Sequence, residues 1–360
     1  MTMVRAFLLA VLALSMAACA PHYLPADPPI RSPELAPTHI VTADGYRLPL
    51  RVWPAEGRTR AVILALHGFN DYSRAYEEPA AYWAKRGVAT YAYDQRGFGE
   101  TAYRGRWPGI PTLTGDLATA AELIRREHPD VPLVLVGESM GAAVVMAALA
   151  AKHPPDADAA VLAAPAVWSR ETMPWYQTAS LWLMAHTMPG MGLTAQGIER
   201  NPSDNIEMLR ELARDPLVIK RTRVDAINGL VDLMDAAYAA APRLHGRVLV
   251  LYGRNEDIIP DGAQTAFEAR LPEHGCVRLA HYKHGYHMLF RDLAGETVMG
   301  DVVAWIDNPS APLPSAADTL AGGDAGRGTS PDAGLAGGTK VAGTATRHAL
   351  SCPRAELARP

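Results

Sequence analysis

One pentapeptide constrains the fold more than any other part of this 360-residue chain. Gly137-Glu138-Ser139-Met140-Gly141 follows an apolar run at residues 131–136 and opens an alanine-rich run at residues 140–152. This pattern places Ser139 in a sharp turn between a buried strand and a helix. Such a turn is strained, and side chains at its two glycines would collide with neighbouring backbone. The helix that follows gives the serine a positive dipole end.

Similar apolar runs recur along the chain and predict the sheet to which that strand belongs. They alternate with helix-like segments, which indicates a mostly parallel sheet with helices on both faces. Asp44-Gly45 predicts a hairpin turn ahead of the first buried strand. The expected strands lie at residues 39–42, 46–53, 61–66, 88–93, 131–136, 159–164, 247–252 and 276–280. The expected helices lie at residues 72–86, 113–127, 140–152 and 296–306.

A serine hydroxyl is a poor nucleophile near neutral pH, so Ser139 needs a general base and an acid that orients the base. Asp257 follows the strand at residues 247–252 and precedes an apolar pair and a proline. We therefore expect its carboxylate to point inward as the orienting acid, with Glu256 as the competing candidate. His287 comes after the last expected strand and before three apolar residues, so it is the predicted base in preference to His284.

A second loop carries the predicted oxyanion hole. His67-Gly68-Phe69 follows the first buried strand directly. We expect the backbone N–H groups of Phe69 and Met140 to face the oxygen that becomes negative when a carbonyl is attacked. His67 is expected to brace this loop by hydrogen bonding rather than to act as a base.

These motifs resemble the monoacylglycerol lipase and lysophospholipase branch of the α/β hydrolases, which is also grouped with the serine aminopeptidases. The matching segments are His67-Gly68, residues 94–99 (Asp-Gln-Arg-Gly-Phe-Gly), residues 137–141, residues 253–260 and residues 287–289. The resemblance implies the α/β-hydrolase fold, with an eight-stranded, mostly parallel sheet and a helical cap. It also implies hydrolysis of carboxylic esters through an acyl-enzyme, with neither a metal nor an organic cofactor. The loop at residues 94–99 is expected to be structural.

The cap is expected at about residues 166–242, a stretch with no obvious strand and many Met and Trp residues. Methionine adapts to flexible chains, so this cluster fits an acyl-chain groove in an enzyme for monoacylglycerol-like or lysophospholipid-like amphiphiles. The residues expected to bind substrate are Trp175, Trp182, Met184 and Met188. The alternative interpretation is that they pack a core.

Two other functions remain open at this point. The first is a serine aminopeptidase or amidase that uses the same triad, because acids in the cap can hold the amine of a substrate. The acids that keep this function open are Glu207, Glu211, Asp225, Asp232 and Asp235. The second is a catalytically silent envelope lipoprotein.

Residues 1–18 read as a signal peptide, because Arg5 precedes an apolar run at residues 6–14. That run is far shorter than the ~20 residues that span a bilayer. Small residues follow and lead to Cys19, as in a bacterial lipobox, although Met16 stands where leucine is usual. We expect Cys19 to be the lipidated first mature residue, at the outer membrane and on its periplasmic face. The alternative is an ordinary cleaved signal and a periplasmic or secreted protein.

The remaining composition sets the domain limits. Proline-rich residues 19–37 read as an extended tether, residues 38–308 as the folded domain, and residues 309–360 as a Gly/Ala/Pro-rich disordered tail. A net charge of −4 does not suggest a nucleic-acid partner. Of the three cysteines, Cys276 and Cys352 could pair in an oxidising compartment.

Overall fold

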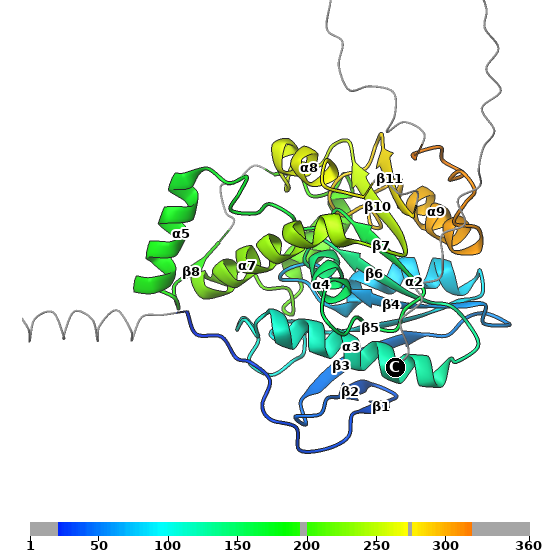
Figure 1. Cartoon of the computed structure of the whole chain (residues 1–360), viewed down its shortest axis with the longest axis horizontal. Coiled ribbons are helices and arrows are strands. Elements are labelled where there is room, and N and C mark those ends of the chain that lie inside the picture. The colour runs from blue at the N-terminus through cyan, green and yellow to red at the C-terminus, as the bar shows by residue number, and fades with distance from the viewer. Residues whose placement is uncertain (1–20, 195–199, 273–275, 319–360) are drawn as a thin grey trace, which may run out of the picture.

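The computed structural model describes residues 21–194, 200–272 and 276–318, which form a nine-stranded sheet covered by helices on both faces (Figure 1). The strands are β1 (Glu34–Ala36), β2 (His39–Val41), β3 (Arg47–Trp53), β4 (Ala61–Leu66), β5 (Val88–Tyr93), β6 (Leu133–Glu138), β7 (Ala159–Ala163), β10 (Arg247–Gly253) and β11 (Val277–Tyr282). Their order is β1-β2-β3-β5-β4-β6-β7-β10-β11. From β5 to β11 the neighbours are parallel, and β1 to β3 extend the edge in antiparallel pairs. The mostly parallel sheet is confirmed, but β1 makes nine strands instead of eight.

Two helical layers bury the sheet. One contains α3 (Ile110–Glu127), α4 (Met140–Leu149), α7 (Val224–Ala240) and α8 (Asp261–Glu268), and the other contains α2 (Glu77–Ala84) and α9 (Gly295–Asp307). In β4, the side chains of Val62, Leu64 and Leu66 pack into the first layer, and those between them pack into the second. This alternation explains the continuous apolar runs, because both faces of each central strand are buried.

The segment predicted as the cap, residues 166–242, is more varied than expected. It contains α5 (Trp175–Thr187), α6 (Ile206–Arg214), α7 and a short antiparallel pair of strands, β8 (Gly192–Leu193) and β9 (Thr222–Arg223). The prediction that the segment holds no strand is therefore wrong. Because α7 packs against α4 as well as α5, the last part of the segment belongs to the helical layer and not to the cap alone. Figure 1 shows α5 at one end of the molecule, outside that layer.

The N-terminal segment is not the free tether that its prolines suggested. Residues 21–36 lie against the domain: Tyr23 donates its hydroxyl to Asp232 of α7 at 2.8 Å, and β1 pairs with β2. The prediction of an extended tether is therefore wrong for these residues, because their backbone and side chains find partners on the domain. The predicted signal peptide and Cys19 lie outside the described residues.

The C-terminal boundary also differs from the prediction. Leu313 and Ala317 are buried, and Ala317 accepts a hydrogen bond from the backbone N–H of His281 at 3.0 Å. Residues 309–318 therefore belong to the folded domain, and residues 319–360 lie outside the described part. Cys276 is disulfide-bonded, whereas the other two cysteines lie outside the described residues. Within the described ranges, no helix is long and apolar enough to cross a membrane.

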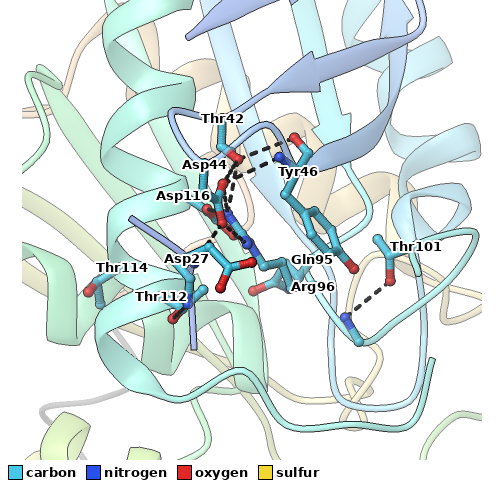
Figure 2. Close-up of polar contacts among 12 residues, drawn as sticks. Asp27, Thr42, Asp44, Tyr46, Gln95, Arg96, Thr101, Thr112, Thr114 and Asp116 are labelled. Atoms are coloured by element: carbon cyan, nitrogen blue, oxygen red, sulfur yellow. Dashed lines mark hydrogen bonds and ion pairs between the residues drawn. The ribbon is translucent and has the colours of Figure 1, made fainter. Parts of the chain in front are cut away.

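Arg96, in the loop after β5, links the N-terminal hairpin to α3 (Figure 2). Its buried guanidinium donates to Asp44 at 2.6 Å and to Asp116 at 2.7 Å, and it lies 4.2 Å from the centre of the Tyr46 ring. Burial raises the pKa of Asp116 to about 6 even though Arg96 opposes this change. The contacts confirm that the loop at residues 94–99 has a structural role.

Candidate active site

Ser139 occupies the strained turn that the pentapeptide predicted. Its φ is 54° and its ψ is −114°, a left-handed conformation that is rare for a residue other than glycine. A Cβ atom at Gly141 would lie 2.0 Å from the carbonyl oxygen of Leu66, and one at Gly137 would lie 2.4 Å from the amide nitrogen of Ala142. Both distances are far inside van der Waals contact, so close packing between β4, β6 and α4 requires the two glycines.

The loop after β4 lies directly beside this turn. A Cβ atom at Gly68 would be 3.5 Å from Cβ of Ser139. Among the described residues, the backbone N–H groups of Phe69 and Met140 donate no hydrogen bond. These are the two amides that were predicted for the oxyanion hole. They remain free for an oxygen that becomes negative beside Ser139.

His67 holds the loop in place. Its Nε2 accepts the backbone N–H of Gln95 at 3.0 Å, so its Nδ1 carries the proton and donates to the carbonyl of Gly68 at 2.8 Å. Complete burial lowers the pKa of His67, so the ring stays neutral. Both ring nitrogens are occupied, which confirms that His67 braces the loop.

His287 pairs with Glu256, and the prediction of Asp257 as its partner is wrong. The distance from His287 Nδ1 to Glu256 Oε2 is 2.7 Å, and both side chains are buried. Burial alone would lower the pKa of His287, but the Glu256 carboxylate outweighs it and the pKa is raised. For Glu256, burial is likewise outweighed by the imidazole and by backbone N–H donors, so its pKa is lowered.

The turn after β10 explains why the acid is Glu256. The N–H groups of Ile258 and Ile259 donate to its Oε1 at 2.7 and 3.0 Å, which leaves Oε2 for the imidazole. The Asp257 carboxylate points elsewhere and accepts the backbone N–H of Asn201 at 3.1 Å. The apolar pair that suggested Asp257 thus supplies amide donors to the residue before it. This i+2 and i+3 donor pattern is the sequence signal that could have identified Glu256.

Ser139 and His287 both line one cavity of about 660 Å³. Because Nδ1 of His287 is held by Glu256, Nε2 is the ring nitrogen available to the serine. No hydrogen bond joins Ser139 to His287 among the described residues. In serine hydrolases this contact is often long until substrate binds, so it does not argue against the pair.

The cavity wall is mostly apolar and comes from the cap and the sheet edge. Its apolar side chains include Trp168, Met173, Leu181, Ile227, Leu230, Val231 and Met234. None of the four predicted substrate contacts lines it. Trp175, Trp182 and Met188 of the α5 region are 80%, 53% and 49% exposed, and Met184 is half-buried away from the cavity. The prediction that these four residues line the groove is wrong.

Residues 200–205 tie the cap to both loops that carry the acid and the base. Pro202 accepts the backbone N–H of Met288 at 2.9 Å, and the Ser203 hydroxyl donates to Asp292 at 2.6 Å. Burial raises the pKa of Asp292 to about 6, although the hydrogen bond from Ser203 opposes the change. The cap therefore forms hydrogen bonds with the catalytic loops and also lines the cavity together with them.

Within residues 21–194, 200–272 and 276–318, no group of three or more His, Cys, Asp or Glu side chains is placed to hold a metal ion.

Comparison with known sequences places these features in a family. The family described as "Serine aminopeptidase, S33" matches residues 57–294. A monoacylglycerol lipase of Mycolicibacterium smegmatis is 26% identical over 267 residues, which cover 73% of this chain and 93% of that protein. A monoglyceride lipase of Mus musculus is 27% identical over 297 residues, which cover 79% and 95% of the two chains.

Solved structures show the same fold. A soluble variant of monoglyceride lipase from Saccharomyces cerevisiae, in complex with a substrate analogue, aligns with a TM-score of 0.63 and 20% identity. The alignment covers 80% of this chain and 98% of that structure. A monoacylglycerol lipase of Paleococcus ferrophilus aligns with a TM-score of 0.59 and 21% identity, over 72% and 98% of the two chains. The architecture of these neighbours is the α/β-hydrolase fold.

Proposed function

Because this chain belongs to the serine aminopeptidase S33 family, we propose that it cleaves monoacyl esters of small polar alcohols through an acyl-enzyme on Ser139. The chain is an ester hydrolase of the α/β-hydrolase type, and the proposal concerns its reaction path and its substrate. One observation carries it: Ser139, the Glu256-paired His287 and Phe69, whose N–H is free, line one mostly apolar cavity, and the free N–H of Met140 directly follows Ser139 in the chain.

In the proposed reaction, His287 Nε2 takes the Ser139 proton as the serine Oγ attacks the ester carbonyl. Glu256 holds the ring through Nδ1–H and stabilises the imidazolium that forms. The carbonyl oxygen becomes negative and accepts hydrogen bonds from the N–H groups of Phe69 and Met140. His287 then gives its proton to the leaving alkoxide. Water, activated by the same imidazole, attacks the acyl-enzyme and releases the fatty acid.

The size and apolar wall of the cavity favour an acyl chain as the part of the substrate that binds inside it. Its volume of about 660 Å³ lies in the range of ligand sites, and its wall is mostly apolar. Relatives over most of the chain are monoacylglycerol lipases, which favours a monoacylglycerol-like ester. Lysophospholipid-like esters share the single acyl chain and differ only in the head group, so both belong to the proposed class.

The aminopeptidase function fits less well. None of the five acids that kept it open lines the cavity. Their carboxylates are paired elsewhere: Asp225 with Arg223, Asp232 and Asp235 with Arg170, Glu207 with Arg210, and Glu211 with Arg74. Asp71 and Glu138 do line the cavity, but both are ion-paired with Arg291. Among the residues that line the cavity, an amine would therefore meet only carboxylates already ion-paired with Arg291, and esters are the favoured substrates.

The test is a panel of monoacylglycerols, lysophospholipids and aminoacyl amides, each assayed with wild type and with Ser139→Ala. We expect the wild type to turn over the monoacyl esters and the variant to lose that activity. Preferred turnover of the amides would favour the aminopeptidase. A folded wild type that neither turns over the panel nor reacts with a fluorophosphonate at Ser139 would indicate a silent scaffold.

We also propose that residues 1–18 are a signal peptide and that a lipid on Cys19 anchors the protein at the periplasmic face of the outer membrane. Helix α5 supports a lipid surface as the neighbour, because it exposes four large apolar side chains, Trp175, Tyr176, Trp182 and Leu183. Aromatic and aliphatic groups of this kind favour the membrane interface. Figure 1 shows the first described residues at the same end of the molecule as α5. The disulfide at Cys276 suits an oxidising compartment.

Cell fractionation tests this anchor. We expect the wild type in the outer-membrane fraction, extractable only with detergent, and Cys19→Ala in the soluble fraction or retained uncleaved. A wild type that is already soluble in the periplasm or the medium would favour the ordinary cleaved signal instead.

A further inference from the structure

A buried cluster of charges lies beneath the three loops of the active site. Arg291 follows His287 by four residues, and its guanidinium is 2.8 Å from Asp71 Oδ2. The same guanidinium donates to Glu138 Oε2 at 2.9 Å. All three side chains are at most 8% exposed. Asp71 belongs to the oxyanion loop and Glu138 directly precedes Ser139, so one guanidinium joins the loops of the base, the nucleophile and the oxyanion hole.

Fold stability alone is a weak reason for such a cluster. Taking three charges out of water costs several kcal/mol for each ion, and well-packed apolar residues are often as stable. The cluster is also incompletely hydrogen-bonded: Glu138 Oε1 and Arg291 Nε are buried with no hydrogen-bond partner among the described residues, and Asp71 Oδ2 meets Arg291 as an ion pair only. What Arg291 supplies that an apolar side chain cannot is a fixed direction toward two carboxylates on separate loops.

We propose that Arg291 is a positioning residue, which holds the His287 loop, the Ser139 turn and the oxyanion loop at the separation that ester cleavage needs. This inference rests on the proposed function. The reacting atoms must be placed closely, since an error of about 1 Å can cost ~100-fold in rate. The substrate cavity opens beside this cluster, because Asp71, Glu138 and Arg291 all line it.

The cluster also sets the charge around the base. The groups that face His287 are Glu256 from the loop after β10, Glu138 from β6 and Arg291 from its own loop. The two carboxylates favour the imidazolium that forms during attack, and Arg291 opposes it. Glu138→Gln would remove one anion and keep the shape of the side chain. The pKa of His287 would then fall.

The decisive variant is Arg291→Lys, which keeps the charge but cannot reach two carboxylates in the same geometry. We expect kcat to fall about 10- to 100-fold while KM changes little. The matched control is Arg96→Lys, because Arg96 is also buried and bridges two carboxylates, Asp44 and Asp116. We expect Arg96→Lys to lower Tm about as much as Arg291→Lys does, but to leave kcat within about threefold of wild type. Equal kcat in Arg291→Lys and wild type, or an equal loss in both variants, would overturn the proposal.

A second readout is independent of the substrate. The rate at which a fluorophosphonate labels Ser139 reports on the nucleophile even if no ester of the panel is turned over. We expect Arg291→Lys to slow labelling about 10-fold or more, and Glu138→Gln to move the acid limb of the labelling rate to lower pH. Wild-type labelling without ester turnover would reject the proposed substrate alone. Unchanged labelling in both variants would reject the positioning role.

Discussion

The turn at Ser139 and helix α5 differ in how much their neighbours determine their residues. At the turn, Cβ atoms at Gly137 and Gly141 would lie within 2.4 Å of backbone, so no other residue fits. On α5 only Ala185 is buried, and its largest side chains face outward. Where backbone packs against backbone, contacts inside the protein determine which residues can occur. Where a helix contacts the domain through few side chains, its other residues are free to suit the surroundings of the protein.

The largest effect is expected in the tightly packed active site, at Glu256, the acid that pairs with His287. Glu256→Gln should lower kcat about 10³- to 10⁴-fold, since the imidazole loses the group that fixes its tautomer. The matched control, Asp257→Asn, should stay within about 10-fold of wild type, because the Asp257 carboxylate accepts its hydrogen bonds from Asn201 of the cap segment and none from His287. Kinetics on a soluble acyl ester decide between them, and a greater loss in Asp257→Asn would restore the original prediction.

The pH profile of the same variant gives a second measure. His287 must be neutral to act as the base, and Glu256 raises its pKa above the usual value of about 6.5. Wild-type kcat/KM should therefore fall as the pH drops below that raised pKa. In Glu256→Gln the larger of the two carboxylate contributions that oppose burial is lost, so the acid limb should move to lower pH. An unmoved limb would mean that another group controls it.

The glycines of the turn test its packing directly. Gly141→Ala should lower stability by about 3 kcal/mol or more and Tm by roughly 6 °C or more, because the new methyl group meets the Leu66 carbonyl. Gly262→Ala in α8 is the control, since a Cβ there meets nothing within 4 Å. Its Tm should stay the same or rise slightly. Thermal unfolding followed by circular dichroism measures both, and equal Tm values would contradict the packing argument.

The inner wall of the cap should control chain length. Leu230→Trp adds bulk to the cavity, so kcat/KM for long acyl esters should fall about 10-fold relative to short ones. Leu183→Trp, on the exposed side of α5, should leave the ratio unchanged. A panel of esters that differ only in chain length gives this ratio. If both variants shift it equally, the cavity is not the acyl site.

The outer face of α5 should show the smallest effect on chemistry. Trp175→Ala should keep kcat/KM for a soluble short ester within about twofold of wild type, and should weaken binding to anionic vesicles about 10-fold. Tyr103→Ala, another exposed aromatic outside α5, should change neither. Vesicle sedimentation measures the binding. Unchanged binding in Trp175→Ala would remove the support that α5 gives to a lipid neighbour.

The same contrast explains how much could be predicted from the sequence. The strands at residues 61–66 and 88–93 were predicted with the bounds that the structure has, because runs buried on both faces are continuous and end at polar turns. The base followed from its place after the last strand. The acid did not, since the apolar pair after Asp257 was interpreted as turning that carboxylate inward, whereas its N–H groups bind the carboxylate of Glu256. The predicted lining of the groove was wrong because helical spacing shows that a face is apolar but not what covers it.

The hydrogen bonds of Tyr23 have a practical consequence for anyone who prepares the enzyme. Its hydroxyl donates to Asp232 and accepts from Asn228, and both partners belong to the helix that carries Ile227 and Leu230 into the cavity. A shortened recombinant protein that starts at residue 38 would still hold every reacting group, yet one wall of its binding site would have lost a support. Substrate preferences are therefore best measured on a protein that keeps Tyr23.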